Sequence, residues 1–293
     1  MDISYLLKCY EAGERNFTGA NLQGVDLSGI ALIGVDFTGA NLTGANLSRA
    51  FLTQSNLSEA FLNWADLTYA KLSDTSFRDT DLTKAMLNGA FLVKANLKLA
   101  KLSGAQLEFA NLRGANLERA NLCGANLSGS NLRGSSLSRA NLNWANLTGV
   151  RLSGANLQGT FLDHVNLTGA FLNGVDLSGV DLSGVNLSEA KLSGANLEGA
   201  NLRASNLSSA QLHGVRLMSA NLTCADLKAA YLKSANLDWS NLSQADLTLA
   251  NLYDAKLLGV RLHDTKYTGA LLPETTREYL NHLSSTPKVA CVA

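Results

Sequence analysis

The residues of this chain best suited to nucleophilic catalysis or metal binding are four histidines and four cysteines. Zinc-binding cysteines usually come in pairs separated by about two to four residues, and the sequence contains no such pair. The cysteines are widely dispersed, at Cys9, Cys123, Cys224 and Cys291. The histidines are equally dispersed, at His164, His213, His263 and His282. The sequence therefore predicts no catalytic residues, no metal ligands and no bound cofactor.

Exposed aromatic and basic side chains could instead bind another protein, because the centres of interfaces favour aromatic residues and arginine. Positions separated by multiples of twenty residues hold many of them in one column: Phe51, Lys71, Phe91, Arg151, Phe171, Lys191 and Tyr231. Three basic residues stand two positions after a member of the same column: Arg113, Arg133 and Lys233. We predict these ten residues as a partner-binding surface. A ladder of aromatic and lysine residues would also stabilise neighbouring strands without any partner, and the sequence leaves both interpretations open.

A repeat of five residues must position this column. From Phe17 to Leu272 every fifth residue is Leu, Phe or Tyr, over 52 repeats without insertion or deletion. Such a spacing would spiral around an α-helix and would alternate between the two faces of a continuous strand. The chain is therefore expected to turn a corner within every repeat, with the corners in register.

The other positions of the repeat indicate which residues are buried and which form the corner. Ala stands two positions before the central residue in 32 repeats, so this small residue and the Leu share a buried side. The residue between them is Asn or Asp in 31 repeats and is expected to point outward. Gly stands two positions after the central residue in 24 repeats, which marks a turn position where a positive φ costs little.

Four short sides closed by four turns make a square coil of 20 residues, and stacked coils can pair as parallel β-bridges about 4.8 Å apart. The expected fold is all-β, a right-handed quadrilateral parallel β-helix of about 13 coils. Leu and Ala are expected to fill its interior and leave no cavity. We name the four sides after their first buried residues: the Phe17, Leu22, Leu27 and Leu32 sides.

The ten candidate binding residues all fall on the Leu32 side, which also differs from the others in charge. Its outward positions carry seven Lys or Arg and three acidic residues, whereas those of the Leu27 side carry three and six. The chain as a whole has a formal net charge of +0. The rod is therefore expected to be neutral overall with one basic side that is rich in aromatic residues.

The repeats 20–24, 125–129 and 195–199 read Ala-Asn-Leu-Gln-Gly, Ala-Asn-Leu-Ser-Gly and Ala-Asn-Leu-Glu-Gly. They closely resemble those of the pentapeptide-repeat family, and the resemblance covers most of the chain. It implies the same right-handed quadrilateral β-helix. Residues 6–17 resemble the segment that precedes the repeats in cyanobacterial members, which suggests a cyanobacterial origin.

The ends of such a rod expose unpaired strand edges, which the sequence is expected to cover with helices. Ile3, Leu6, Leu7 and Tyr10 have the spacing of one helix face, with Asp2 as N-cap and Gly13 as stop. The expected segments are an N-terminal helical cap at 1–14, the β-helix at 15–274, a C-terminal helical cap at 275–285 and a disordered tail at 286–293. In some members of the family the C-terminal segment joins two rods end to end, which leaves a homodimer open here.

The balanced charge gives no general attraction to nucleic acid, and no run of about 18 apolar residues could span a membrane. Many Asn-Leu-Ser/Thr sequences and the unpaired cysteines fit a cytoplasmic location better than a secreted one. The expected function is a non-catalytic scaffold that binds a protein partner, of unknown identity, along one side of the rod.

An alternative follows from the resemblance, because quinolone-protection members of the family mimic duplex DNA and act on the topoisomerase gyrase. A mimic needs acidic residues in place of phosphates, about one charge per 1.7 Å of duplex. Residues 16–274 hold 20 acidic and 20 basic residues, which does not meet this requirement.

Overall fold

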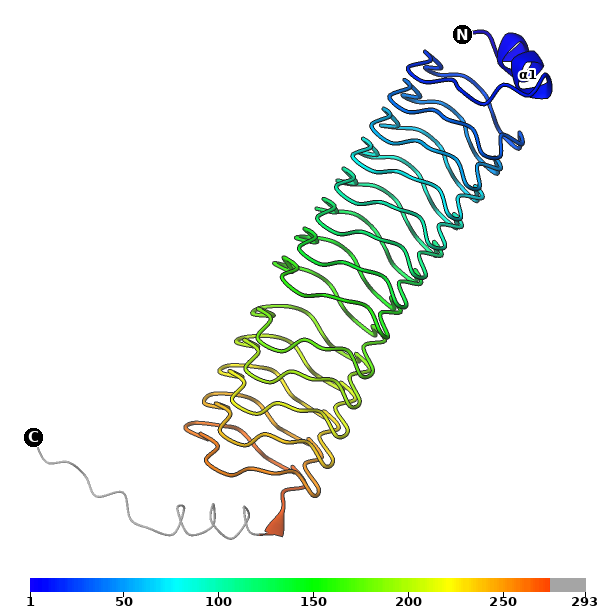
Figure 1. The fold of residues 1–293 in the computed structure, drawn as a ribbon. Helices are drawn as coiled ribbons and strands as arrows, with labels where there is room; N and C mark the ends of the chain where they lie inside the picture. Colours follow the sequence, from blue (N-terminus) through cyan, green and yellow to red (C-terminus); the bar gives the residue numbers. More distant parts are fainter. Residues whose placement is uncertain (275–293) are drawn as a thin grey trace, which may run out of the picture.

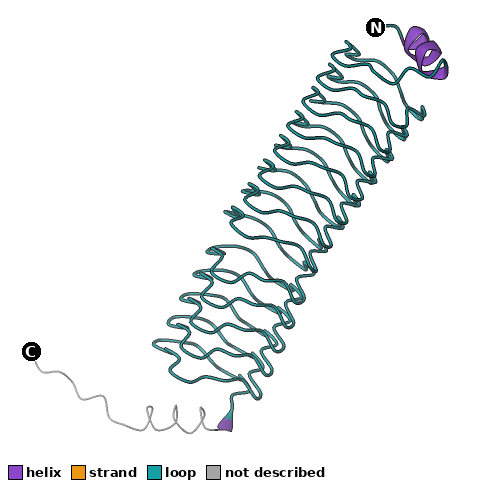
Figure 2. Ribbon diagram, in the orientation of Figure 1, coloured by secondary structure: helices purple, strands orange, loops and turns teal. Residues whose placement is uncertain are grey.

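The computed structural model describes residues 1–274, which form a long rod with its N-terminal helix at one end (Figure 1). The helix α1 spans Ile3–Glu11 and packs Leu6 completely out of solvent against the first coils. The rest of the described chain consists of turns and single bridges rather than long strands (Figure 2). The expected C-terminal cap at 275–285 and tail at 286–293 lie outside the described residues.

Each repeat closes its own corner as the sequence predicted. In the first repeat the Ala20 N–H donates to the Phe17 carbonyl at 3.0 Å, and Gly19 has a φ of +66°. A positive φ at the third residue is the mark of a type II turn. Every corner residue from Gly19 to Gly269 has a positive φ, although 27 of them are not glycine.

The outward Asn or Asp of a repeat also contributes to the corner. The Oδ1 atom of Asn41 accepts the N–H of Thr43 at 3.1 Å, and Oδ1 of Asp81 accepts the N–H of Thr83 at 3.0 Å. This Asx turn satisfies a backbone donor that would otherwise face solvent. The Asx turn explains why Asn and Asp are so frequent at this outward-facing position.

Adjacent coils are joined by parallel bridges between residues 20 apart, from Asn16↔Asp36 to Asn251↔Leu271. In a regular pair the Leu22 N–H donates to the Asn41 carbonyl at 2.7 Å, and the Asn41 N–H donates to the Ala20 carbonyl at 2.9 Å. The predicted stacking of residues at twenty-residue intervals is therefore confirmed.

The interior is a continuous apolar column. The central residues from Phe17 to Leu252 are all buried, together with most of the small residues that precede them. Most hydroxyls in this column bond to the backbone, as where Thr75 Oγ1 donates to the Leu52 carbonyl at 2.7 Å. Among the described side chains, the hydroxyls of Ser130 and Ser240 are buried without a partner.

The ladder is interrupted at one place. The bridges that would join 156 to 176 and 161 to 181 are missing, although those on either side of them are formed. The coils are visibly wider apart there, where the ribbon in Figure 1 passes from green to yellow-green. A cleft of about 640 Å³ opens between them, which corrects the expectation that the stacked coils leave no cavity.

Candidate partner-binding surface

The ten predicted residues are arranged along the Leu32 side as the register required. Bridges link Phe51 to Lys71 and Lys71 to Phe91, so these three side chains form one stack, the Phe91 cluster. A second stack, the Phe171 cluster, contains Arg151, Phe171 and Lys191, also linked by bridges. The structure therefore brings six of the ten residues together in two groups.

Within each cluster a cation lies over an aromatic ring. Lys71 Nζ is 3.3 Å from the centroid of the Phe91 ring. Lys191 Nζ is 4.1 Å from the centroid of the Phe171 ring, and Arg151 Cζ is 5.9 Å from it. Each such contact contributes about 0.5–1 kcal/mol at an exposed site, so part of the ladder stabilises the coils themselves.

The aromatic side chains of the clusters nevertheless remain accessible. Phe51 is 43% exposed and Phe91 is 38% exposed, while Phe171 is half-buried between its two cations. Contact with a cation on one face leaves the rest of each ring free to pack against another molecule. The cation–π stacks also hold the rings in fixed positions, which lowers the entropy lost when a partner binds.

The other four residues lie outside the two clusters. Arg113 and Arg133 are exposed between them and have no salt bridge within the described part of the chain. Tyr231 is 59% exposed further along the rod. Lys233 Nζ lies 5.4 Å from the ring of Tyr253, an exposed residue of the same side that the sequence prediction omitted.

The Leu32 side differs from its neighbours in how its charges are compensated. Lys98 pairs with Glu118 at 2.9 Å on the Phe17 side, and Lys228 on the Leu27 side contacts Asp226 at 3.2 Å and Asp246 at 3.6 Å. The hydrogen bond to Asp226 raises the pKa of Lys228. No salt bridge forms on the Leu32 side within residues 1–274. Four of its basic residues lie over aromatic rings instead: Lys71, Arg151, Lys191 and Lys233.

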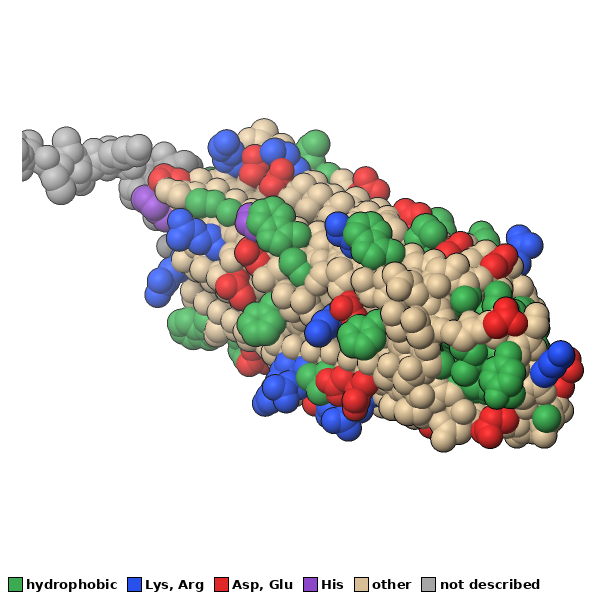
Figure 3. Space-filling model, turned by 90° about the horizontal axis from the view of Figure 1, so that it is seen from above, with side chains coloured by type: hydrophobic (Ala, Val, Ile, Leu, Met, Phe, Trp, Pro, Cys, Tyr) green, Lys and Arg blue, Asp and Glu red, His purple; other side chains and the backbone are tan. Residues whose placement is uncertain are grey.

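On the face seen in Figure 3, most exposed hydrophobic side chains are separated by polar surface. Besides those of the Leu32 side, the exposed hydrophobic side chains of the rod include, on the Leu22 side, Phe61, Trp64, Trp144 and Phe161. The ring of Trp144 stacks on that of His164 with centroids 4.0 Å apart.

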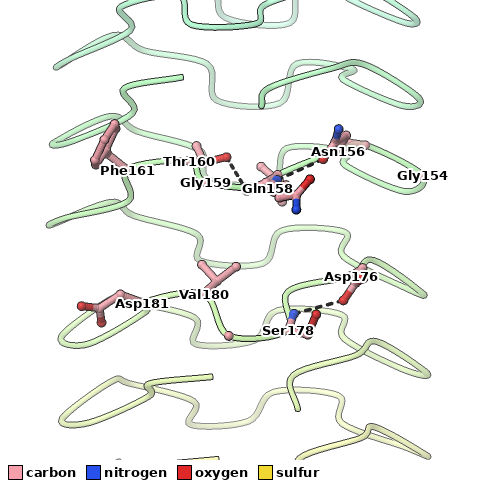
Figure 4. Close-up of a pocket in the computed structure, with 13 residues that line it drawn as sticks. Gly154, Asn156, Gln158, Gly159, Thr160, Phe161, Asp176, Ser178, Val180 and Asp181 are labelled. Carbon is pink, nitrogen blue, oxygen red and sulfur yellow. Dashed lines mark hydrogen bonds between the residues drawn. The ribbon is translucent and has the colours of Figure 1, made fainter. Parts of the chain in front are cut away.

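The inter-coil cleft was not predicted from the sequence. Its walls are residues 154–161 of one coil and 176–181 of the next, from the Phe17 and Leu22 sides, which face each other in Figure 4. The only sequence signal near it is a stack of two β-branched residues, Thr160 and Val180, where Ala is usual. That signal is weak, because Val165 and Val185 form a similar stack beside Asn166 and Asn186, whose bridge is formed although the Asn186 N–H lacks its bond to the Val165 carbonyl.

The described residues offer no arrangement for catalysis on a metal. No group of three or more His, Cys, Asp or Glu residues among them could hold a metal ion. The cysteines at positions 9, 123 and 224 are free thiols. No helix within the described chain is long and apolar enough to cross a membrane.

The sequence model of the pentapeptide repeats matches this chain along nearly the whole rod. The matched residues are 16–54, 45–83, 62–98, 80–119, 100–139, 115–154, 145–184, 186–223 and 230–266. A search of curated protein sequences found no match.

Solved structures similar to this chain are also pentapeptide-repeat proteins. HetL of the cyanobacterium Nostoc sp. strain PCC 7120, involved in heterocyst differentiation regulation, is 33% identical over 94% of this chain and 98% of HetL, with a TM-score of 0.21. Rfr23 of the cyanobacterium Cyanothece 51142 is 27% identical over 56% of this chain and 94% of its own, with a TM-score of 0.13. QnrB1, a plasmid-mediated fluoroquinolone resistance protein, is 19% identical over 89% of this chain and 97% of its own, with a TM-score of 0.36.

The match of the repeat model confirms the resemblance read from the repeats. The chain belongs to the pentapeptide-repeat family, whose members fold as right-handed quadrilateral β-helices.

Proposed function

We propose that this protein is a non-catalytic scaffold that binds a protein partner through the Leu32 side of its rod. The observation that carries the proposal is the combination of accessible aromatic rings with basic groups that form no salt bridge on that side. Aromatic residues and arginine are the side chains that contribute most to binding at protein interfaces.

The length of the surface restricts the kind of partner. Residues 51 and 231 are nine 20-residue coils apart, which is roughly 43 Å at a spacing of about 4.8 Å. A standard interface buries about 800 Å² on each partner, so a compact partner would cover one cluster and the neighbouring arginines. An elongated or repeated partner would be needed to engage both clusters.

A partner surface that complements this side would be acidic and partly apolar. Acidic residues would pair with Arg113 and Arg133, and apolar side chains would pack against Phe51 and Phe91. Because these positions lie at the rim of the rod and not in its core, substituting them should change binding without changing the fold.

The DNA-mimic alternative has less support. The ion pairs and basic residues distributed along the rod are the opposite of a phosphate-like surface. A supercoiling assay with purified gyrase separates the two functions, because a mimic changes the rate of supercoiling in the absence of any other protein.

The remaining expectations stay predictions: a cytoplasmic location, about 13 coils, the segment limits 1–14, 15–274, 275–285 and 286–293, and an end-to-end homodimer through the C-terminal end. A size measurement in solution would separate a single rod from an end-to-end pair, because the pair has twice the length.

The test of the partner-binding side is a capture experiment with matched variants. The site variant combines Phe51, Phe91 and Phe171→Ala with Arg113, Arg133 and Arg151→Glu. The control variant places the same kinds of change on other sides: Phe61, Trp64 and Phe109→Ala with Arg119, Arg139 and Arg203→Glu. A partner retained from source-cell lysate by wild type and control but lost by the site variant would support the proposal, and equal recovery by all three would contradict it.

A further inference from the structure

The inter-coil cleft exposes the backbone of two coils that would normally pair. In the regular coil before it, the Leu137 N–H donates to the Asn156 carbonyl at 2.8 Å, and the Asn156 N–H donates to the Ser135 carbonyl at 2.9 Å. The equivalent bonds one coil further on are missing on the Phe17 and Leu22 sides. Both walls of the cleft therefore present open strand edges.

The unpaired groups include donors on both walls and acceptors on both walls. The N–H groups without a backbone acceptor on the first wall belong to Gly154, Leu157, Gly159, Leu162 and His164, and on the second wall to Asp176 and Asp181. The carbonyls left without these donors include those of Ala155 and Thr160 on one wall and Asp176 and Asp181 on the other. An extended peptide backbone carries the complementary donors and acceptors at a matching spacing.

The side chains around the cleft favour a basic occupant. Asp163, Asp176 and Asp181 are exposed there, and the residues that line the opening include no Lys or Arg. Two of these carboxylates are held in place by the following coil: Asn196 Nδ2 donates to Asp176 at 2.8 Å and Asn201 Nδ2 donates to Asp181 at 3.0 Å. Held carboxylates provide a fixed negative charge for a Lys or Arg side chain.

The cleft also offers an apolar contact and sufficient volume. The ring of Phe161 is 59% exposed at its edge, and the core residues Leu157 and Leu162 are slightly exposed inside it. The volume of about 640 Å³ lies within the range of about 300–1,000 Å³ typical of ligand pockets. Figure 4 shows Asp176 and Asp181 on one wall, facing Asn156 and Phe161 on the other.

We propose that the inter-coil cleft binds an extended peptide segment carrying Lys or Arg side chains, which pairs with the open strand edges and is anchored by Asp176 and Asp181. This site is distinct from the aromatic and basic residues of the Leu32 side, since all of its lining residues except the corner residue Gly154 come from the Phe17 and Leu22 sides. The main-chain hydrogen bonds supply affinity, and the carboxylates with Phe161 select the sequence.

The test uses three fluorescein-labelled seven-residue peptides and fluorescence anisotropy. The first alternates Lys and Val, the second alternates Glu and Val, and the third is the Lys/Val peptide with N-methyl groups on the backbone nitrogens of its valines. The site variant is Asp176→Asn with Asp181→Asn, which keeps the Asx acceptors and removes the charge. The matched control is Asp36→Asn with Asp81→Asn, on the same two sides but in coils whose bridges are formed.

The expected result is saturable binding of the Lys/Val peptide to wild type and control, with binding at least fivefold weaker to the site variant and for the N-methylated peptide. Hydrogen exchange at the amides of Leu157 and Leu162 should slow when the Lys/Val peptide is bound. Equal binding to site variant and control would show only a general charge attraction. The proposal would be overturned by that result. It would also be overturned by tight binding of the Glu/Val peptide or by the absence of saturable binding.

Discussion

The corner glycines provide a sharp test of how neighbouring coils contact each other. Gly124 and Gly129 both have a φ of +65°, but only Gly129 is covered by a side chain of the preceding coil. A Cβ atom at position 129 would lie 2.5 Å from Cε1 of the Phe109 ring, whereas one at position 124 would have no atom within 4 Å. We therefore predict that Gly129→Ala destabilises the rod more than Gly124→Ala.

The magnitude follows from two terms. An alanine held in the left-handed region costs about 1–2 kcal/mol, and this term is common to both variants. Phe109 is 75% exposed, so about a quarter of a ring of about 200 Å² contacts the corner and is lost when the ring moves away. At about 25 cal/mol per Å² this loss adds about 1.2 kcal/mol to the cost of Gly129→Ala.

The assay is urea-induced unfolding followed by circular dichroism, comparing the midpoints of the two variants. In a third protein, Gly129→Ala is combined with Phe109→Ala. The extra destabilisation caused by the alanine at position 129 should disappear there, since the ring that clashes with it is absent. Equal midpoints for Gly124→Ala and Gly129→Ala would refute the packing of Phe109 on the following corner.

Three further predictions concern the core, the cleft and the acid response. Ser130→Ala should stabilise the rod by about 1 kcal/mol in urea unfolding, because its buried hydroxyl has no partner, whereas Ser135→Ala removes a bonded hydroxyl and should bring no gain. In hydrogen exchange the Leu157 amide should exchange at least tenfold faster than that of Leu137, which is bonded to the next coil. Hydrogen bonds from the Ser183 side chain and backbone lower the pKa of Asp181 in the folded chain. The carboxylate of Asp181 therefore stabilises the fold above its unfolded pKa of about 3.9, and this stabilisation is lost as the pH falls through the folded pKa. The loss of melting temperature between pH 5 and pH 3 should therefore be smaller in Asp181→Asn than in wild type.

Each of these has a distinct contradictory result. A lower midpoint for Ser130→Ala would mean that its hydroxyl is bonded in solution. Equal exchange of the two leucine amides would mean that the cleft is closed. An identical acid response of wild type and Asp181→Asn would mean that the carboxylate gains nothing from Ser183.

The sequence predicted the coil because the repeat leaves few alternatives. A Leu at every fifth position can be buried only if the chain turns once in each repeat, and Gly19 and its equivalents mark that turn. The column of Phe51, Lys71 and Phe91 follows directly from this register. The register does not predict how the side chains pair, because rotamers depend on the local neighbours. For example, it does not predict that Lys191 lies closer than Arg151 to the Phe171 ring.

The inter-coil cleft is a different case, because it is a departure from the repeat. The residues at its walls, including Asn156 and Asp176, have the same types as those in closed coils. Stacking of Thr160 and Val180 adds volume inside the rod, but beside the similar stack of Val165 and Val185 the Asn166↔Asn186 bridge is formed, so side-chain size alone does not locate the opening. Its position could be found only from the backbone hydrogen bonds of the folded chain.

The central claim, that the Leu32 side binds a protein partner, is tested most directly by photo-crosslinking in the source cells. A photoreactive phenylalanine analogue would replace Phe51, Phe91 or Tyr231 on the Leu32 side, and Phe61, Trp64 or Phe109 on the other sides as controls. All six side chains are exposed, so they can carry the probe without altering the core. Phe171 is half-buried and is left intact. The account predicts a crosslinked product of the same size from the three Leu32-side positions and none of that size from the controls. Crosslinking of that partner from the control positions alone would contradict it.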